Sequence, residues 1–172
     1  MTDSGLASDV VRLLADAGST LAVAESLTGG ALVAAVVDVP GASAVLRGGV
    51  VAYATDLKAE LLDVPRELLA ARGAVHPDVA TAMARGVRER LGATWGVATT
   101  GVAGPDPQDG RPPGEYHVAV VGPDRALVRS FGPEGAQVRA QVRAAARDAA
   151  LVLLVEALGQ SSGTGAPPAA LD

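Results

Sequence analysis

The sequence contains no cysteine, and its 172 residues include only one tryptophan, two tyrosines, one phenylalanine and two histidines. The absence of cysteine excludes thiol nucleophiles, disulfide bonds and zinc sites built on thiolates. The two histidines, His76 and His117, are too far apart in the sequence to form a metal-binding pair on one helix. We therefore expect a protein without a bound metal or cofactor.

Positive charge is also scarce, because 14 lysines and arginines stand against 19 acidic residues and the net charge is −5. This balance argues against a nucleic-acid partner bound through a broad basic surface. No apolar run approaches the roughly 18 residues of a membrane span, and the N-terminus, MTDSGLASDV, lacks the basic and apolar regions of a signal peptide. We expect a soluble, cytoplasmic protein with no nucleic-acid or membrane partner.

Hydrophobic residues make up 49% of the chain, mostly as alanine, valine and leucine, which is enough for one domain with a closely packed core. Periodicity predicts strands at 21–24, 45–54, 95–100, 115–121 and 125–131, and helices at 6–14, 31–37, 55–62, 64–71, 77–91 and 133–158. Gly48-Gly49 predicts a bulge or a close backbone approach in the second strand. The pattern indicates a layered α/β domain with a mixed sheet over residues 1–158, followed by a disordered tail at 159–172.

The segment Glu25-Ser26-Leu27-Thr28-Gly29-Gly30 lies where a predicted strand passes into a predicted helix. The turn exposes Ser26, and the helix N-terminus behind it offers unpaired N–H groups and a partial positive charge. Such a turn can hold an anion or stabilise an oxyanion. The alternative interpretation is a helix cap followed by a glycine turn, which any α/β protein can contain.

A serine nucleophile needs a base, and few candidates are available in this sequence. Lys58 and Tyr53 bracket the end of the second predicted strand and the helix after it. A lysine whose pKa is lowered by burial can serve as the base, as in Ser–Lys hydrolases. Alternatively, Lys58 is a solvated helix residue and Tyr53 packs at the edge of the core.

Two further patterns suggest a binding site. The glycine-rich segment 99–105 follows a strand, and its backbone amides can form a nest for an anion or a carbonyl oxygen, although it lacks the Walker A and dinucleotide-binding patterns. Arg139, Arg143 and Arg147 recur every four residues and share one helix face. That face is either solvated or a phosphate clamp, since guanidinium groups match phosphate oxygens.

Sequence blocks of these kinds occur in a specific order. They are AESLTGG at 24–30, VPGAS at 39–43, GGVVAY at 48–53, Lys58, GAV at 73–75, TGVAGP at 100–105, Arg139 and Arg143. In this order the chain resembles the CinA C-terminal domain family, whose active members are nicotinamide mononucleotide deamidases of the PncC type. The resemblance covers about residues 6–158. It implies a three-layer α/β domain in the stand-alone form of the family.

The resemblance also implies an activity, the hydrolysis of the carboxamide of nicotinamide mononucleotide to nicotinate mononucleotide and ammonia, a step of pyridine-nucleotide salvage. Ser26 would be the nucleophile and Lys58 would take its proton. Tyr53 would relay that proton or orient the two side chains. Amides of the turn at Thr28, Gly29 and Gly30 would hold the oxyanion, while Thr100, Gly101, Arg139 and Arg143 would line the substrate pocket, with the 5′-phosphate against Arg143 or Arg139.

Some residues depart from the family pattern. His76 stands where a serine is common, Glu115 adds a charge near the expected pocket rim, and Arg147 has no counterpart. Two alternative functions therefore stay open: a catalytically silent nucleotide-binding or regulatory module, and an amidase with another substrate. The small surface side chains and long amphipathic helices also favour a homodimer or a higher homo-oligomer.

Overall fold

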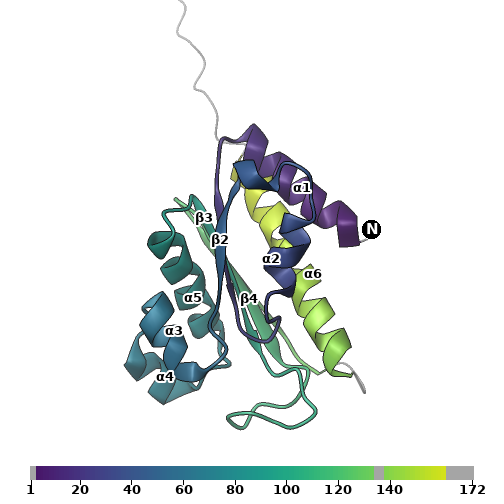
Figure 1. Ribbon diagram of the computed structural model, residues 1–172. Helices are drawn as coiled ribbons and strands as arrows, with labels where there is room; N and C mark the ends of the chain where they lie inside the picture. Colours follow the sequence, from purple (N-terminus) through teal and green to yellow (C-terminus); the bar gives the residue numbers. More distant parts are fainter. Residues whose placement is uncertain (1–2, 134–137, 162–172) are drawn as a thin grey trace, which may run out of the picture.

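The chain forms a five-stranded sheet between two layers of helices, in a computed structural model that describes residues 3–133 and 138–161 (Figure 1). The elements are α1 (Asp3–Asp16), β1 (Leu21–Glu25), α2 (Ala31–Val37), a short 3-10 helix η1 (Ala42–Ala44), β2 (Leu46–Val51), α3 (Thr55–Leu62), α4 (Arg66–Arg72), α5 (Pro77–Arg90), β3 (Trp95–Gly101), β4 (Tyr116–Val121), β5 (Ala126–Phe131) and α6 (Arg139–Ser161).

The strand order in the sheet is β2-β1-β3-β4-β5. The first three strands are parallel, because helices connect them, and β4 and β5 form an antiparallel hairpin beside β3. All five residues of β1 are buried, as are all six of β4, since helices cover both faces of the central strands. The predicted α/β fold with a mixed sheet is confirmed.

One face of the sheet carries α3, α4 and α5, and the other carries α1, α2 and α6 (Figure 1). Each face has its own hydrophobic core, which includes Met83 and Leu62 on the first side and Leu14 and Leu154 on the second. Glycine permits the closest contacts between layers. A Cβ atom on Gly86 would lie 1.8 Å from the Leu62 carbonyl oxygen, so α5 can approach the end of α3 only with glycine there.

The double glycine in β2 has both predicted consequences. Opposite β1, the register shifts so that Leu21 pairs with Leu46 and Ala22 with Gly48, which leaves one extra residue as a bulge. A Cβ atom on Gly49 would lie 3.1 Å from a methyl group of Val33 on α2. The bulge and the close approach are therefore both confirmed.

The last helix differs from the prediction at both ends. It begins at Arg139 rather than near Pro133, and the preceding Val138 acts as its cap. The Val138 carbonyl accepts hydrogen bonds from the amides of Gln141 and Val142, and its own amide donates to the Gln141 side chain at 3.0 Å. The helix continues to Ser161, so residues 159–161 of the predicted tail are helical. Residues 162–172 lie outside the described residues.

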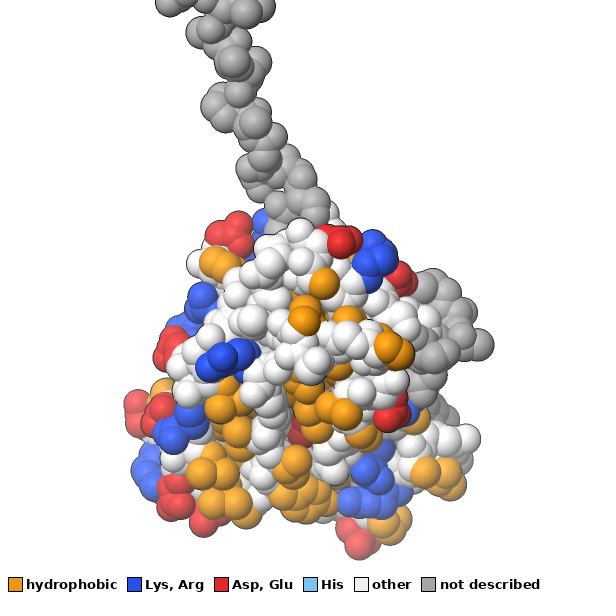
Figure 2. Space-filling model, turned by 45° about the horizontal axis from the view of Figure 1, so that its top comes forward, with side chains coloured by type: hydrophobic (Ala, Val, Ile, Leu, Met, Phe, Trp, Pro, Cys, Tyr) orange, Lys and Arg blue, Asp and Glu red, His pale blue; other side chains and the backbone are white. Residues whose placement is uncertain are grey.

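Large apolar side chains reach the surface at scattered positions. Those exposed are Val37, Val51, Tyr53, Val128, Val138 and Val152, spread over both edges of the sheet and its helices. Figure 2 shows hydrophobic side chains on one face gathered between groups of both charges. No interface follows from this distribution alone, so self-association stays a prediction. Within the described chain, no helix is long and apolar enough to cross a membrane.

Candidate active site

Ser26 lies at the carboxyl end of β1, in the turn that leads to α2. Its amide donates to the Thr99 carbonyl oxygen on β3 at 3.1 Å, which extends the sheet pairing by one residue. Gly29 and Gly30 then adopt left-handed conformations with φ of 60° and 97°, which glycine reaches without strain. The predicted strand, tight turn and helix are thus confirmed, and ligand sites in open α/β sheets lie at this end of the strands.

The Glu25 side chain fixes this turn from within the protein. Its carboxylate is 1% exposed and accepts hydrogen bonds from the amides of Gly30, Leu32 and Val33 at 2.9, 3.0 and 2.8 Å. It therefore occupies the N-terminus of α2. Sequence reasoning assigned no role to Glu25, although an acidic residue just before a glycine turn and a helix is a signal for this kind of cap.

This cap changes the predicted roles of the turn glycines. The Gly30 amide is bound to Glu25, and the Gly29 amide donates to the Ser26 carbonyl oxygen at 3.1 Å. Neither amide is available to an oxyanion, in contrast to the prediction. The amides of Leu27 and Thr28 have no acceptor among the described residues, so they are the remaining donors of the turn.

Lys58, the only lysine in the sequence, reaches Ser26 from α3. Its side chain is 1% exposed, and its Nζ lies 3.1 Å from Ser26 Oγ, 2.8 Å from the Ala52 carbonyl oxygen and 3.3 Å from the Tyr53 carbonyl oxygen. The alternative interpretation of Lys58 as a solvated helix residue is therefore excluded. The structure brings together the predicted nucleophile and its predicted base.

Burial changes the ionisation of this amine. Removal from water lowers the pKa of Lys58 from its usual value of 10.5 to about 8, although the carboxylates of Asp109 and Asp56 act in the opposite direction. A neutral amine has two N–H donors and one lone pair. Because two carbonyl oxygens accept the two donors, the lone pair of neutral Lys58 is left for the hydroxyl of Ser26.

Tyr53 contributes differently from the prediction. Its backbone carbonyl contacts Lys58, but its hydroxyl accepts a hydrogen bond from Arg139 Nη2 at 2.8 Å. Arg139 also donates from Nη1 to the Gly104 carbonyl oxygen at 2.7 Å. In the part of the chain that the structure describes, no hydrogen bond joins the Tyr53 hydroxyl to Ser26 or Lys58. No direct contact therefore supports a role of that hydroxyl in relaying a proton between Ser26 and Lys58.

Next to Ser26 lies a cavity of about 400 Å³, a size suited to a small molecule. Its walls are Ser26, Leu27, Tyr53, the segment 101–108 and Arg139. Gly101, predicted to line the pocket, is in this wall. A Cβ atom at Gly101 would lie 2.4 Å from the Cβ atom of Tyr116 on β4, so a larger residue would displace the wall.

Three other predicted binding residues lie behind the cavity instead of lining it. The Thr28 hydroxyl is fully buried and lies 2.7 Å from the hydroxyl of Thr99. The Thr100 hydroxyl donates to the Ala74 carbonyl oxygen at 2.7 Å. Arg143 donates to backbone carbonyl oxygens of the Ser26 turn. Their observed contacts hold the framework of the site.

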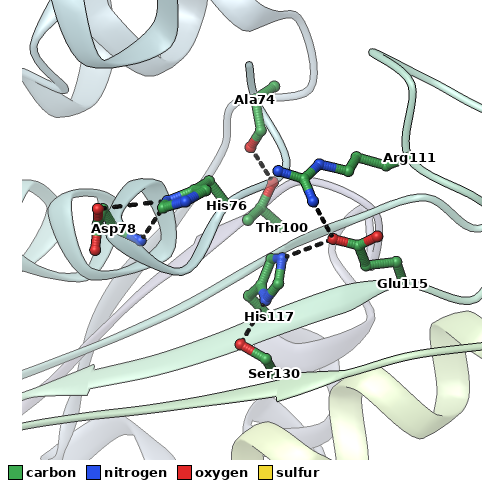
Figure 3. Close-up of polar contacts among 8 residues, drawn as sticks. All are labelled: Ala74, His76, Asp78, Thr100, Arg111, Glu115, His117 and Ser130. Atoms are coloured by element: carbon green, nitrogen blue, oxygen red, sulfur yellow. Dashed lines mark hydrogen bonds and ion pairs between the residues drawn. The ribbon is translucent and has the colours of Figure 1, made fainter. Parts of the chain in front are cut away.

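Glu115, predicted near the pocket rim, faces a polar cluster at the base of the cavity loop (Figure 3). Its Oε1 lies 3.3 Å from Arg111 Nη1 and 3.4 Å from His117 Nε2, while His117 Nδ1 lies 2.8 Å from Ser130 Oγ. Burial lowers the pKa of His117, although Glu115 opposes this shift. The cluster ties the loop to β4 and β5, and Glu115 is not part of the cavity wall.

His76 caps α5, as a residue before a proline at the first helical position can. Its Nδ1 accepts a hydrogen bond from the Asp78 amide at 3.2 Å. Arg147 pairs with Asp148 at 2.8 Å and also lies outside the cavity wall. Among the described residues, no group of three or more histidine, aspartate or glutamate side chains could hold a metal ion.

Curated proteins of similar sequence are known. A "CinA-like protein" from Frankia casuarinae is 54% identical over 137 residues, which are 80% of this chain and 32% of that protein. A "CinA-like protein" from Gloeobacter violaceus is 46% identical over 150 residues, 87% of this chain and 35% of that protein. The chain thus spans about a third of the length of these curated relatives.

The fold recurs in solved structures. The competence/damage inducible protein CihA from Agrobacterium tumefaciens superposes with a TM-score of 0.87 at 34% identity, covering 93% of this chain and 98% of that one. The sequence profile of the CinA C-terminal domain matches residues 3–158, which contain the Ser26–Lys58 pair and the whole cavity wall. The chain belongs to the CinA C-terminal domain family.

Proposed function

We propose that this domain is an amidohydrolase that removes ammonia from the carboxamide of nicotinamide mononucleotide, with Ser26 as nucleophile and Lys58 as base. The observation that carries the proposal is the 3.1 Å contact between Lys58 Nζ and Ser26 Oγ at the edge of a small-molecule cavity. A lysine of lowered pKa beside a serine hydroxyl is the arrangement that activates a serine without histidine.

The reaction follows from this pair in two halves. Ser26 Oγ attacks the carboxamide carbon while neutral Lys58 accepts the hydroxyl proton, which forms a tetrahedral intermediate. Lys58 then returns the proton to the nitrogen, the C–N bond breaks, and ammonia leaves an ester on Ser26. Water, deprotonated by Lys58, attacks the ester, and the acid is released as Ser26 recovers its proton.

Negative charge develops on the carbonyl oxygen beside Ser26. The amides of Leu27 and Thr28 directly follow the nucleophile and have no acceptor in the described chain, so we assign the oxyanion to them. The amide after a nucleophilic serine has this role in other hydrolases that place the serine on a strand-to-helix turn. The fixed turn requires no reorganisation when the charge forms.

The choice of substrate rests on the family resemblance together with the composition of the cavity wall. Arg139 is the only cationic side chain in that wall, and a guanidinium group suits a 5′-phosphate. Tyr53 brings an aromatic ring to the wall, a group that can bind a pyridinium, and Asp106 supplies a carboxylate that no described residue pairs with. Opposite charges in one wall suit a zwitterionic nucleotide.

Ammonia release from a panel of amides tests this function. Nicotinamide mononucleotide, nicotinamide, NAD and glutamine are offered separately to the wild-type domain. Release from the mononucleotide alone supports the proposal, and release from another amide assigns the chemistry to a different substrate. Nucleotide binding without release from any of the four contradicts an amidohydrolase and favours a silent binding module.

A further inference from the structure

Arg143 lies on α6 next to the nucleophile turn but does not line the cavity. The geometry points to Arg143 as a positioning residue: it holds the peptide planes after Ser26 so that the Leu27 and Thr28 amides are fixed as oxyanion donors. The inference rests on the proposed function for its kinetic readout. It replaces the direct contact with a substrate phosphate that the sequence predicts.

Two hydrogen bonds establish the contact. Arg143 Nε donates to the Leu27 carbonyl oxygen at 3.0 Å, and Nη2 donates to the Thr28 carbonyl oxygen at 2.7 Å. The side chain is half-buried, and its Nη2 would lie 3.6 Å from a Cβ atom added to Gly29. Two guanidinium nitrogens are thus committed to the turn.

The planarity of the peptide bond connects these carbonyls to the free amides. In a trans peptide the C=O and the following N–H point in opposite directions, so fixing one fixes the other. The bond to the Leu27 carbonyl therefore sets the direction of the Thr28 amide. The bond to the Thr28 carbonyl sets the Gly29 amide, which donates to the Ser26 carbonyl oxygen at 3.1 Å. That carbonyl in turn sets the Leu27 amide.

No other described contact of the turn replaces the hydrogen bonds that Arg143 donates to the Leu27 and Thr28 carbonyl oxygens. The Ala31 amide reaches the Thr28 carbonyl oxygen at 3.3 Å, and the Glu25 carboxylate binds amides only from Gly30 onward. Among the described residues, Arg143 is the one donor to the Leu27 carbonyl oxygen. Its planar fork can serve two neighbouring carbonyls at once, whereas the point charge of a lysine serves them less well.

The test compares Arg143→Ala and Arg143→Lys with Arg147→Ala, a matched control one turn along the same helix outside the cavity wall. Thermal unfolding establishes which variants are folded. With nicotinamide mononucleotide, we expect Arg143→Ala to lower kcat about tenfold or more and to change KM less than about twofold, because an oxyanion donor acts in the transition state. Arg143→Lys should recover part of kcat, and Arg147→Ala should match the wild type.

A readout without the nucleotide separates this inference from the proposed substrate. Diisopropyl fluorophosphate forms an Oγ–P bond with an activated serine and releases fluoride, and the rate of labelling at Ser26 is followed by mass spectrometry. Slower labelling of Arg143→Ala supports the inference even if the wild type does not hydrolyse the mononucleotide. If Arg143→Ala does not fold, Arg143→Lys decides in the same way.

Three results would overturn the positioning role. The first is labelling of the folded Arg143 variants at the wild-type rate, and the second is a loss confined to KM, which would return Arg143 to substrate binding. The third is a wild-type Ser26 that does not react with the reagent. Failure of the proposed substrate alone appears differently, as normal labelling of the wild type without ammonia release.

Discussion

The pKa of Lys58 can be measured directly, because Lys58 is the only lysine in the chain. A sample grown with 13Cε-lysine has a single lysine side-chain resonance, whose chemical shift follows the charge of the amine. We expect the midpoint of this titration at about 8, against a usual value of 10.5, because burial disfavours the ammonium form. Unfolding in denaturant should return the midpoint to its usual value.

The same pKa determines how strongly activity should depend on pH. With a pKa of about 8, the neutral fraction of Lys58 is about 9% at pH 7 and about 91% at pH 9. If only the neutral amine accepts the Ser26 proton, kcat/KM for ammonia release should rise about tenfold between these pH values. Lys58→Arg, whose guanidinium stays charged, should show low activity and no such rise.

Two results would contradict neutral Lys58 as the base. A lysine resonance that titrates at its usual pKa would show that burial does not destabilise the ammonium form. A kcat/KM that is flat or falls between pH 7 and pH 9 would mean that the charged amine is the active form, with Lys58 acting as a hydrogen-bond donor. Thermal unfolding at each pH separates these outcomes from a loss of fold.

Three further predictions concern the groups around this pair. Since the unfolded chain binds the Lys58 proton more tightly between pH 8 and pH 10.5, stability should rise with pH there, by about 1.5 kcal/mol from pH 8 to 9.5 in denaturant unfolding, and Lys58→Met should lack this slope. Asp109→Asn removes a carboxylate that raises the pKa of Lys58, so the 13C titration should move to lower pH, and an unmoved midpoint would contradict that contribution. Glu25→Gln leaves one oxygen for three amide donors, so the free energy of unfolding should fall by roughly 2–4 kcal/mol, and an unchanged value would contradict the cap.

The order of the elements was predictable because each has a local signal. Gly48-Gly49 marked the bulge in β2, and Pro77 marked the start of α5. The start of α6 was not predictable in this way, because Pro133 is compatible with a first helical turn. The helix instead begins after Val138, the cap residue, whose amide donates to the Gln141 side chain, a contact that depends on side-chain geometry.

The site was predicted as a set of residue types, but their contacts depend on tertiary structure. Ser26 and Lys58 lie 32 positions apart, and only the tertiary fold, in which α3 packs against α5, brings them to 3.1 Å. The Tyr53 hydroxyl likewise contacts Arg139, which is 86 positions away in the sequence. The spacing of Arg139 and Arg143 predicts one helix face, yet one arginine lines the cavity and the other holds the Ser26 turn.

Ammonia release from nicotinamide mononucleotide by the wild type and by Ser26→Ala tests the role of Ser26 as nucleophile most directly. Ser26→Ala removes one buried oxygen but keeps the hydrogen bonds of Glu25, Thr28 and Arg143 that hold the turn. The variant should therefore unfold at nearly the wild-type temperature. We expect turnover by the wild type and its loss by at least about a thousandfold in the variant. A folded Ser26→Ala variant that retains near wild-type turnover would show that Ser26 is not the nucleophile.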